Sequence, residues 1–571
     1  MLPIFARADY PGTPLEWSGC GIDTFCATLE FCKDGSNYGY RKPGDQGACG
    51  ALPGPLIRMN PGNTYKLTLH NTASDPTVLT NLHTHGLHID GSGDGDNVFR
   101  KVGGGSCLRY TWDIPADHPG GTNWYHPHYH TLTNEQTSGG AFGMLIIEDN
   151  QNDISSWARI SNEKILQISD TGSLLGNGLS NEIVQVETGK WYRLRVSVVT
   201  PGAKPSDVGF VGGDCTVYKV ASDGVWHTQP LDSYPGNAFE LTGASRADFA
   251  IKCSSAGSTD ITWGNGIAAT LLSGSFGSGT GSDETSLGTA PAKPYSLSDI
   301  AEVSVPSANF YDISLSGAKI NGQTYSEEVG LGEIAFDEVH EWTISGSGAH
   351  PFHTHLYHML IVSPGGCGAH KEGEFYDTLS ASGSCIVRFK TADIGQRMVL
   401  HCHVLSHEDN GAINFMDVVG NIPNPNNVDD PAYTCSAAPP PGPQVTPAPT
   451  EPPATPAPTT AEPIVTPGPT PADNTGVCPS TCTTNSDCCS NNCKNGTCKG
   501  SNNPPETPAP TPVPAPVGTP VPAPVGTPVP TPAPVPICPS TCSTNSDCCS
   551  NNCKRGQCKG GRFLRAMGNP V

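Results

Sequence analysis

The heptapeptide 401–407, His-Cys-His-Val-Leu-Ser-His, has the side chains of two kinds of metal site. Neighbouring side chains on a β-strand point to opposite faces, so Cys402 can serve one site while His401 and His403 serve another. Imidazole and thiolate ligands together suit copper, and two histidines with one cysteine form the trigonal set of blue-copper sites. Cys402 and His407 supply two of these three ligands, and the third must come from elsewhere in the chain.

Three more histidine clusters are available, and each contains histidines two residues apart. His83 and His85, followed by Gly86, would lie on one face of a strand and could share a metal cluster. The same holds for His126 and His128. Structural histidines in a β core are a poor alternative for two such pairs. The remaining cluster is His350-Pro-Phe-His353-Thr-His355.

Eight of the 18 histidines lie outside these clusters, and four of them stand near the clusters or alone on a strand-like stretch and are not expected to be ligands. His88, His118 and His130 are interpreted as surface groups or as neighbours of the metal ligands. His227 stands alone and is interpreted as a surface residue.

The segments that must position these clusters look like short β-strands. Alternating stretches such as TYKLTLHNT at 64–72 are separated by turn residues, which is typical of β-sandwiches. The sequence therefore predicts an all-β protein with three strand-rich units, of which the middle one lacks the histidine pairs. The expected ranges are a cysteine-containing lead-in at 1–50, then units at 51–150, 155–295 and 296–435.

The four histidine motifs have the forms HxHG, HxH, HPxHxH and HCHxxxH, and they occur in this order. In this respect the chain resembles the multicopper oxidases, a family that includes laccases, bilirubin oxidases and ferroxidases. The resemblance covers about residues 40–425. It implies three cupredoxin-like Greek-key β-sandwich domains, with a middle domain that holds no copper.

The resemblance also implies four copper ions and a role for each motif residue. Type 1 copper would take His350, Cys402 and His407. Type 2 copper would take His83 and His353. The type 3 pair would take His85, His126, His128, His355, His401 and His403.

This arrangement agrees with the electron count of the implied reaction. A reducing substrate gives up one electron at a time, whereas dioxygen needs four electrons to become two waters. One site must collect electrons and another must hold dioxygen. Cys402 would bind the first site and its two neighbours the second, so the covalent path between them is one residue long. His407 is the expected point where electrons enter.

One position departs from the family pattern. Many bacterial relatives have a methionine ten residues after the cysteine as a weak axial ligand, and this chain has Ala412 there. The axial ligand tunes the potential of such sites, so we expect a three-coordinate, fairly oxidising type 1 copper. Met416 is the alternative donor on the same strand face.

Two carboxylates are candidates for moving protons to the dioxygen site. Glu408 follows a type 1 ligand, as does the glutamate assigned to this role in relatives. Asp96 matches the acid that follows the HxHG motif, with Asp94 as the alternative register. Carboxylates suit proton transfer when they are hydrogen-bonded near the reacting group.

The cysteines of the oxidase region suggest disulfide bonds. Cys20, Cys26, Cys32 and Cys49 are expected to form two local bridges, with three pairings possible. Cys215 with Cys253 and Cys367 with Cys385 are candidate pairs. Cys107 and Cys435 remain, and their bridge would be comparable to one in laccases.

The reducing substrate is open. Laccase-like oxidation of phenols needs only an accessible edge of the type 1 site. Oxidation of ferrous or cuprous ions also needs carboxylates there, for which the candidates are Asp409, Glu372, Glu374 and Asp377. The methionine-rich insert of bacterial cuprous oxidases is absent, and the chain has seven methionines in all. We therefore expect a small phenolic substrate.

Composition limits the partners and the compartment. The net charge of −22 over 571 residues argues against nucleic acid or an anionic membrane as partner. No apolar run reaches the length of a membrane span. The 23 cysteines favour an oxidising compartment, so we expect a secreted or wall-associated monomer. The start lacks a signal-peptide pattern, which suggests a truncated gene prediction or an unrecognised export route.

The C-terminal quarter differs in composition from the rest. Residues 436–477 and 500–537 are rich in proline and threonine and are expected to be extended linkers. Residues 478–499 and 538–559 repeat one six-cysteine spacing that resembles inhibitor cystine knots, and a basic tail follows at 560–571. These modules allow a second reading, in which the chain binds a polysaccharide or cell wall and its oxidase activity is secondary.

Overall fold

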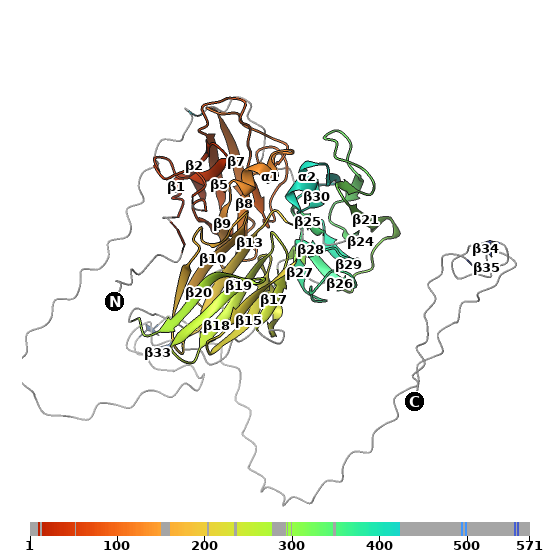
Figure 1. Cartoon of the computed structure of the whole chain (residues 1–571). Coiled ribbons are helices and arrows are strands. Elements are labelled where there is room, and N and C mark those ends of the chain that lie inside the picture. Colours follow the sequence, from red (N-terminus) through yellow and green to blue (C-terminus); the bar gives the residue numbers. More distant parts are fainter. Residues whose placement is uncertain are drawn as a thin grey trace, which may run out of the picture. The chain divides into compact units, whose positions relative to one another are not determined.

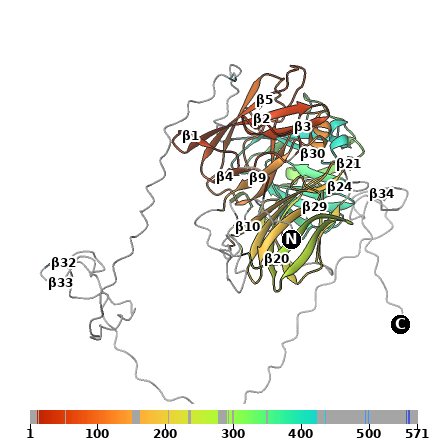
Figure 2. The same cartoon turned by 60° about the vertical axis from the view of Figure 1, so that its left-hand side comes forward.

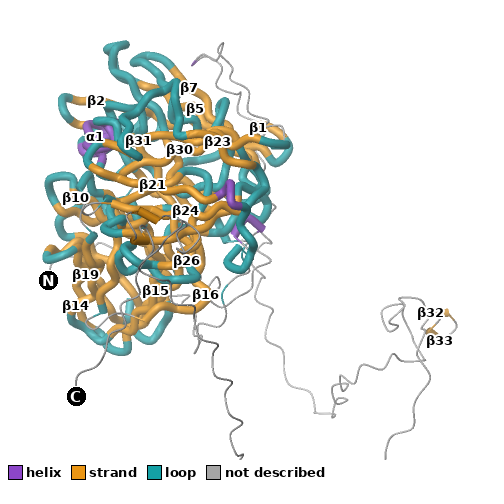
Figure 3. The backbone as a smooth tube through the Cα atoms, turned by 90° about the vertical axis from the view of Figure 1, so that its right-hand side faces the viewer, coloured by secondary structure: helices purple, strands orange, loops and turns teal. Residues whose placement is uncertain are grey.

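The computed structural model describes residues 10–422 apart from short gaps, of which 150–159 and 277–289 are the longest. It also describes Cys435 and residues 493–494, 497–498, 553–554 and 557–558. Strands and loops make up most of the described chain, and the helices are short (Figure 3). The predicted all-β fold is confirmed.

The N-terminal part forms a two-sheet sandwich, here called sandwich 1. One sheet has the order β1-β2-β5-β7 with β3 beside β2, and the other has the order β4-β9-β8-β6. The alternation of β5 places Tyr65, Leu67 and Leu69 in the core between the sheets, where Trp112 also lies. The elements are β1 (Ser18–Gly21), β2 (Thr24–Asp34), β3 (Asn37–Arg41), β4 (Ile57–Met59), β5 (Thr64–Asn71), β6 (His83–His85), β7 (Cys107–Asp113), β8 (Gly121–His126), α1 (Thr133–Ser138) and β9 (Gly143–Ile147).

Sandwich 2 follows with sheets ordered β11-β10-β13-β18-β15-β16 and β12-β20-β19-β14-β17. Its core is built from both sheets and includes Val196, Phe210 and Phe249. Its strands are β10 (Glu163–Asp170), β11 (Leu174–Gly176), β12 (Glu182–Glu187), β13 (Tyr192–Val199), β14 (Ser206–Val211), β15 (Cys215–Ser222), β16 (Val225–Asp232), β17 (Ala238–Leu241), β18 (Arg246–Cys253), β19 (Gly257–Trp263) and β20 (Gly266–Gly274).

Sandwich 3 has sheets ordered β22-β21-β24-β29-β26-β27 and β23-β31-β30-β25-β28. Its core includes Trp342, Phe352 and Cys402. Its elements are η1 (Tyr295–Leu297), η2 (Ser307–Asn309), β21 (Phe310–Ser316), β22 (Lys319–Ile320), β23 (Gly332–Ala335), β24 (Val339–Gly346), β25 (Pro351–Thr354), β26 (Met359–Ser363), β27 (Phe375–Tyr376), β28 (Thr378–Ser380), β29 (Ser384–Lys390), β30 (Gln396–Cys402), α2 (Leu405–Asp409) and β31 (Ile413–Val419).

The three sandwiches repeat one topology. Each strand of sandwich 2 has a counterpart in sandwich 3 at the same place in the sheet order, so that β14 matches β25 and β19 matches β30. In sandwich 1 the equivalent strands are β6 and β8. The histidine motifs lie on or next to these equivalent strands of sandwiches 1 and 3, whereas β14 and β19 contain no histidine.

The expected boundary at residue 50 is wrong. β2 pairs in parallel with β5 from Thr24↔Thr64 to Phe31↔Asn71, and β3 pairs with β2, so the lead-in belongs to sandwich 1 (Figure 2). The alternating apolar residues Phe25, Ala27, Leu29 and Phe31 carry the strand signal that the cysteines and glycines obscured.

The expected cysteine pairs are confirmed. The two N-terminal bridges join neighbours in sequence, Cys20 to Cys26 and Cys32 to Cys49. The bridges in sandwiches 2 and 3 and the one that ties sandwich 1 to the segment after β31 are Cys215–Cys253, Cys367–Cys385 and Cys107–Cys435.

The C-terminal residues form a separate compact unit, 454–571. Within it the structure describes two short ribbons, β32 (Cys493–Lys494) with β33 (Thr497–Cys498), and β34 (Cys553–Lys554) with β35 (Gln557–Cys558). The two ribbons have the same register, as the sequence repeat predicts. The rest of both cysteine modules, the linkers and the basic tail lie outside the described residues.

Among the described residues, no helix has the length and apolar character needed to cross a membrane.

Candidate metal centre

Equivalent strands bring the histidine motifs of sandwiches 1 and 3 into the same register. In sandwich 1, His83 on β6 pairs with His126 at the end of β8. In sandwich 3, His353 on β25 pairs with His401 near the end of β30. Each sandwich therefore offers two histidine-bearing strands that end side by side.

The two sandwiches face each other through these histidines. The ring of His83 stacks on His355 with centroids 3.9 Å apart, and His85 stacks on His353 at 3.7 Å. The first histidine of one motif thus meets the second histidine of the other, as expected for a pseudo-twofold arrangement. His403 lies 5.5 Å from His126 between ring centroids. The cluster therefore requires both sandwiches, as do the type 2 and type 3 ligand sets that the family resemblance implies.

The free nitrogens of these rings fit a metal cluster. Within the described protein, His83 Nε2, His85 Nδ1, His126 Nε2 and His353 Nε2 are buried without a hydrogen-bond partner. Buried polar atoms without partners are rare in proteins, and imidazole nitrogens are good copper ligands. Candidate ligand atoms lie within 4.8 Å of one another in three overlapping groups: His83, His85 and His126; His83, His353 and His355; His128, His355 and His401.

The opposite ring nitrogens are anchored by the protein. His83 Nδ1 lies 2.7 Å from Asp96 Oδ2, His126 Nδ1 lies 2.9 Å from the Pro127 carbonyl oxygen, and His353 Nδ1 lies 2.9 Å from the Asp377 carbonyl oxygen. Such contacts fix the tautomer and orientation of a metal-binding histidine.

Of the two aspartates proposed after the HxHG motif, Asp96 is the one beside the histidines. Its Oδ1 accepts hydrogen bonds from the backbone and side chain of Thr84. Burial raises its pKa to about 7, although the Thr84 bonds oppose the shift. Asp94 instead accepts a hydrogen bond from Thr111 Oγ1 at 2.8 Å and one from Arg109 Nε at 3.2 Å.

Glu408 is fully buried and lies beside two other histidines of the cluster. Its carboxylate oxygens lie 3.3 Å from His401 Nδ1 and 3.5 Å from His128 Nδ1. Thr133 at the start of α1 donates a hydrogen bond to Glu408 Oε1 at 2.9 Å, so α1 and α2 are in contact (Figure 1). Burial raises the pKa of Glu408.

Cys402 faces the core of sandwich 3, on the opposite side of β30 from His401, as the strand alternation predicts. Its Sγ lies 3.2 Å from His350 Nδ1 and 3.7 Å from His407 Nδ1. Among the described residues it is the one cysteine outside a disulfide. The three residues therefore form the two-histidine, one-cysteine set expected for type 1 copper.

The surroundings of Cys402 are apolar. Burial raises the pKa of its thiol to about 12, so the thiolate needs a bound cation to form at neutral pH. Ala412 is fully buried and its carbonyl oxygen accepts the Cys402 N–H at 2.9 Å. Met416 pairs with Met398, three positions along the strands from the His401–Ile413 pair. This is about 10 Å along the strand, which places Met416 too far away to serve as the axial ligand.

Three histidines expected at or near the surface are buried. His88 donates its backbone N–H to His118 Nε2 at 3.0 Å, and both side chains lie in the interior. His227 is 1% exposed and its Nε2 lies 2.9 Å from Ser222 Oγ. His130 is partly buried against Tyr325. The surface interpretation of His227 is therefore wrong, and so is the surface alternative for His88 and His118, because isolated histidines carry no periodic signal of burial in the sequence.

Two of the four carboxylates proposed to flank the type 1 site, Glu374 and Asp377, are instead buried in contacts with sandwich 2. Glu374 is buried and accepts a hydrogen bond from the Thr228 backbone at 2.9 Å. Asp377 is also buried, beneath the histidine cluster, and is ion-paired with Arg246 of sandwich 2. Arg246 could not be found from local sequence patterns, because 131 residues separate it from Asp377.

Comparisons with known proteins agree with this geometry. Sequence profiles described as Multicopper oxidase match residues 46–152 and 291–419, which carry all four histidine motifs. Laccase-1 from Agaricus bisporus is 25% identical over 450 residues, with 63% of this chain and 84% of that protein covered. Laccase-2 from Thanatephorus cucumeris is 29% identical over 243 residues, which cover 36% of this chain and about two fifths (39%) of that protein's own length.

A solved structure has the same architecture. The multicopper oxidase from Campylobacter jejuni, described as a metallo-oxidase, superposes with a TM-score of 0.56 at 19% identity, covering 71% of this chain and 94% of that one. Three repeated β-sandwiches with histidine motifs on the outer two define a cupredoxin-type copper protein. Both outer sandwiches thus match the multicopper oxidase family.

Proposed function

We propose that this protein is a copper oxidase that couples one-electron oxidation of a small phenolic substrate to reduction of dioxygen to two waters. One observation carries the proposal. Cys402 lies in a two-histidine, one-cysteine group on one side of β30, and its neighbours His401 and His403 belong to the histidine cluster on the other side. Two metal sites are therefore joined through adjacent residues.

The ligand roles follow the family motifs. His350, Cys402 and His407 would hold type 1 copper, and His83 and His353 would hold type 2 copper. Bound copper would supply one-electron redox chemistry at both sites. The type 3 pair would be held by His85, His126, His128, His355, His401 and His403.

His407 is the proposed point where the substrate delivers electrons. It is partly exposed, whereas the other ten proposed ligands are buried. A phenol that contacts the His407 ring would be two side chains away from the dioxygen site along the path through Cys402.

Asp96 and Glu408 are proposed to hold and deliver protons. Each is buried and lies beside histidines of the cluster, at 2.7 Å from His83 and 3.3 Å from His401 respectively. Burial raises both pKa values toward the range in which a carboxyl exchanges protons near neutral pH.

A phenol fits the surroundings better than a metal ion. Ferrous or cuprous substrates need free carboxylates near His407. Glu374 and Asp377 are buried in other contacts, and Asp409 accepts hydrogen bonds from the backbone N–H groups of Thr133 and Asn134. Of the four candidates, Glu372 alone is exposed.

The test is dioxygen consumption by copper-loaded protein with a simple phenol and, separately, with ferrous ion. We expect four phenols oxidised for each dioxygen and no hydrogen peroxide. Cys402→Ser should abolish the reaction while the fold is retained. Faster turnover of ferrous ion than of any phenol would instead establish a metal oxidase.

The compartment and the C-terminal modules are part of the proposal. Five disulfides among the described residues support an extracellular location. We propose that the cysteine modules bring the oxidase to a polysaccharide or cell wall. Sedimentation of the full chain with insoluble glycans tests this, with a chain that ends at residue 453 as the control. Equal sedimentation of both would reduce the modules to spacers.

A further inference from the structure

A buried ion pair lies where the three sandwiches meet. Arg246 is the first residue of β18 in sandwich 2, and its side chain is fully buried. Its Nη1 and Nη2 donate to the two carboxylate oxygens of Asp377, at 2.7 and 2.5 Å. Asp377 lies between β27 and β28 of sandwich 3. Two-pronged pairs of this kind fix the geometry of both partners.

Asp377 also contacts one histidine from each half of the cluster. Its Oδ1 lies 3.3 Å from His85 Nε2, which lies 3.2 Å from Thr378 Oγ1. Its carbonyl oxygen lies 2.9 Å from His353 Nδ1. The opposite nitrogens, His85 Nδ1 and His353 Nε2, have no partner within the described protein. Asp377 therefore selects the ring nitrogen that each histidine leaves for metal.

Sandwich 1 has room for the Arg246 guanidinium because Gly86 has no side chain. A Cβ atom at Gly86 would lie 2.3 Å from Arg246 Nη2 and 2.3 Å from Asn123 Oδ1, and the backbone there has a φ of +101°. Gly86 is the glycine of the His-Thr-His-Gly motif, so this motif leaves room for a guanidinium from another sandwich. Arg246 Nε also donates to the Thr122 carbonyl oxygen of sandwich 1 at 3.3 Å.

A second carboxylate completes the network. Asp223, in the turn between β15 and β16, accepts the N–H groups of Asp377 and Thr378 at 3.2 Å each. It also accepts the Arg246 N–H at 2.9 Å. Burial raises the pKa of Asp377, but the charge and hydrogen bonds of Arg246, together with the neighbouring His353 and His358, hold that pKa below its ordinary value. Both carboxylate oxygens of Asp377 accept hydrogen bonds from Arg246.

We propose that Arg246 is a positioning residue for the type 2 and type 3 copper site. Through Asp377 it holds one proposed type 3 ligand, His85, and one proposed type 2 ligand, His353, in their metal-binding orientation. The sandwich that contains no copper ligand thus contributes to the dioxygen site. This inference rests on the proposed function.

The alternative is that the pair only ties the sandwiches together. Arg195 provides a matched control, because it too is a buried arginine of sandwich 2. It pairs with Glu163 at 2.6 Å and reaches Thr122 of sandwich 1 at 3.2 Å. Its bonded partners do not include a cluster histidine. A structural tie predicts similar defects in variants of both arginines, whereas positioning predicts defects at copper only for Arg246.

The experiment compares Arg246→Gln, Arg246→Lys and Arg195→Gln with wild-type protein after anaerobic loading with cuprous ion and reoxidation. The readouts are copper content, the type 1 absorption, the type 2 electron spin resonance signal, the near-ultraviolet type 3 band and the rate of dioxygen reduction. Arg246→Gln should keep the type 1 band and its reduction rate by phenol. Its type 2 signal should change, and copper affinity at that site or dioxygen reduction should fall about 10- to 100-fold.

Arg246→Lys should recover part of the loss, because lysine supplies the charge without the two-pronged bond. Arg195→Gln should keep all copper signals. A wild-type type 2 signal and dioxygen rate in Arg246→Gln, or the same copper defects in Arg195→Gln, would overturn the proposal.

If Arg246→Gln does not fold, Asp377→Asn replaces it in the experiment. Its copper defects should match those expected for Arg246→Gln. Unaltered signals in Asp377→Asn would equally overturn the proposal. A wild-type protein that takes up no copper would contradict the proposed function and this inference with it. A wild-type protein with all signals and an unaltered Arg246→Gln would contradict the inference alone.

Discussion

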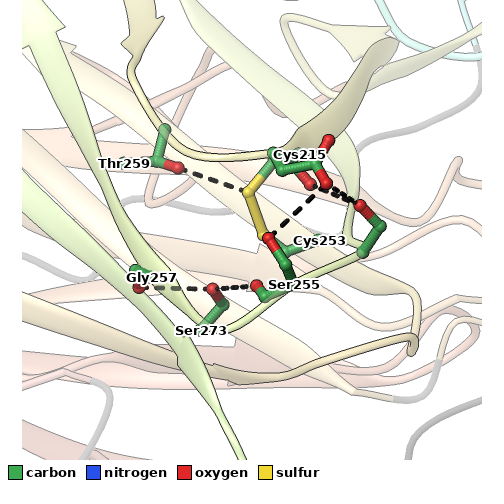
Figure 4. The surroundings of a disulfide bond; sticks show 8 residues. Cys215, Cys253, Ser255, Gly257, Thr259 and Ser273 are labelled. Carbon is green, nitrogen blue, oxygen red and sulfur yellow. Dashed lines mark hydrogen bonds between the residues drawn. A yellow bond between two sulfur atoms is a disulfide. The ribbon is translucent and has the colours of Figure 1, made fainter.

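The disulfide Cys107–Cys435 joins sandwich 1 to the segment that follows sandwich 3, across 328 residues of chain. In sandwich 2, Cys215–Cys253 joins opposite residues of β15 and β18 across 38 residues (Figure 4). Cross-links limit the freedom of the unfolded chain, and the effect grows with the length of the closed loop. The chain-entropy relation gives about 6 kcal/mol for the first bridge and about 4 kcal/mol for the second at 25 °C.

We therefore expect Cys107→Ala with Cys435→Ala to lower the free energy of unfolding about 2 kcal/mol more than Cys215→Ala with Cys253→Ala. Urea unfolding followed by tryptophan fluorescence at one pH measures both. The first pair should also lower copper occupancy of the histidine cluster, because that cluster needs sandwiches 1 and 3 together. An equal or larger loss for the Cys215 pair, or full copper occupancy without Cys107–Cys435, would refute this reasoning.

Three further predictions concern the copper sites and pH. Ala412→Met should lower the type 1 potential by adding a soft axial donor, and a redox titration that returns the wild-type value would exclude this. Glu408→Gln should slow dioxygen reduction about 100-fold while the type 1 site is still reduced at the wild-type rate, both measured by stopped flow, and unchanged reoxidation would remove Glu408 from proton delivery. Burial lowers the pKa of His118 to about 3 and that of His227 to about 4, so the unfolded chain takes up these protons first as pH falls below 6.5. Urea unfolding should show the free energy of unfolding falling by about 2 kcal/mol between pH 6 and pH 5 from these two groups, and His227→Gln should remove half of that loss, whereas an identical pH slope would contradict it.

The sequence predicted the proposed ligands because each motif is local. Histidines two residues apart share a strand face, and a cysteine between two of them faces the other way. These rules place His401, Cys402 and His403 without knowledge of the fold. The ligand sets that the family resemblance implies include histidines of both sandwich 1 and sandwich 3.

The sequence could not predict contacts that depend on tertiary packing. Arg246 and Asp377 come from different sandwiches, and neither stands in a repeated pattern. Asp377 was therefore expected near the type 1 edge, whereas the fold places it under His85 and His353. His227 was expected at the surface because one histidine on a strand gives no information on what packs against it.

The most direct test of the central claim is the absorption and electron spin resonance spectrum of copper-loaded wild-type protein, with copper counted per chain. We expect four coppers per chain, an intense visible band from thiolate bound to copper, a near-ultraviolet type 3 band and two distinct resonance signals. A colourless protein, or one that holds a single type of copper, would contradict the proposed oxidase.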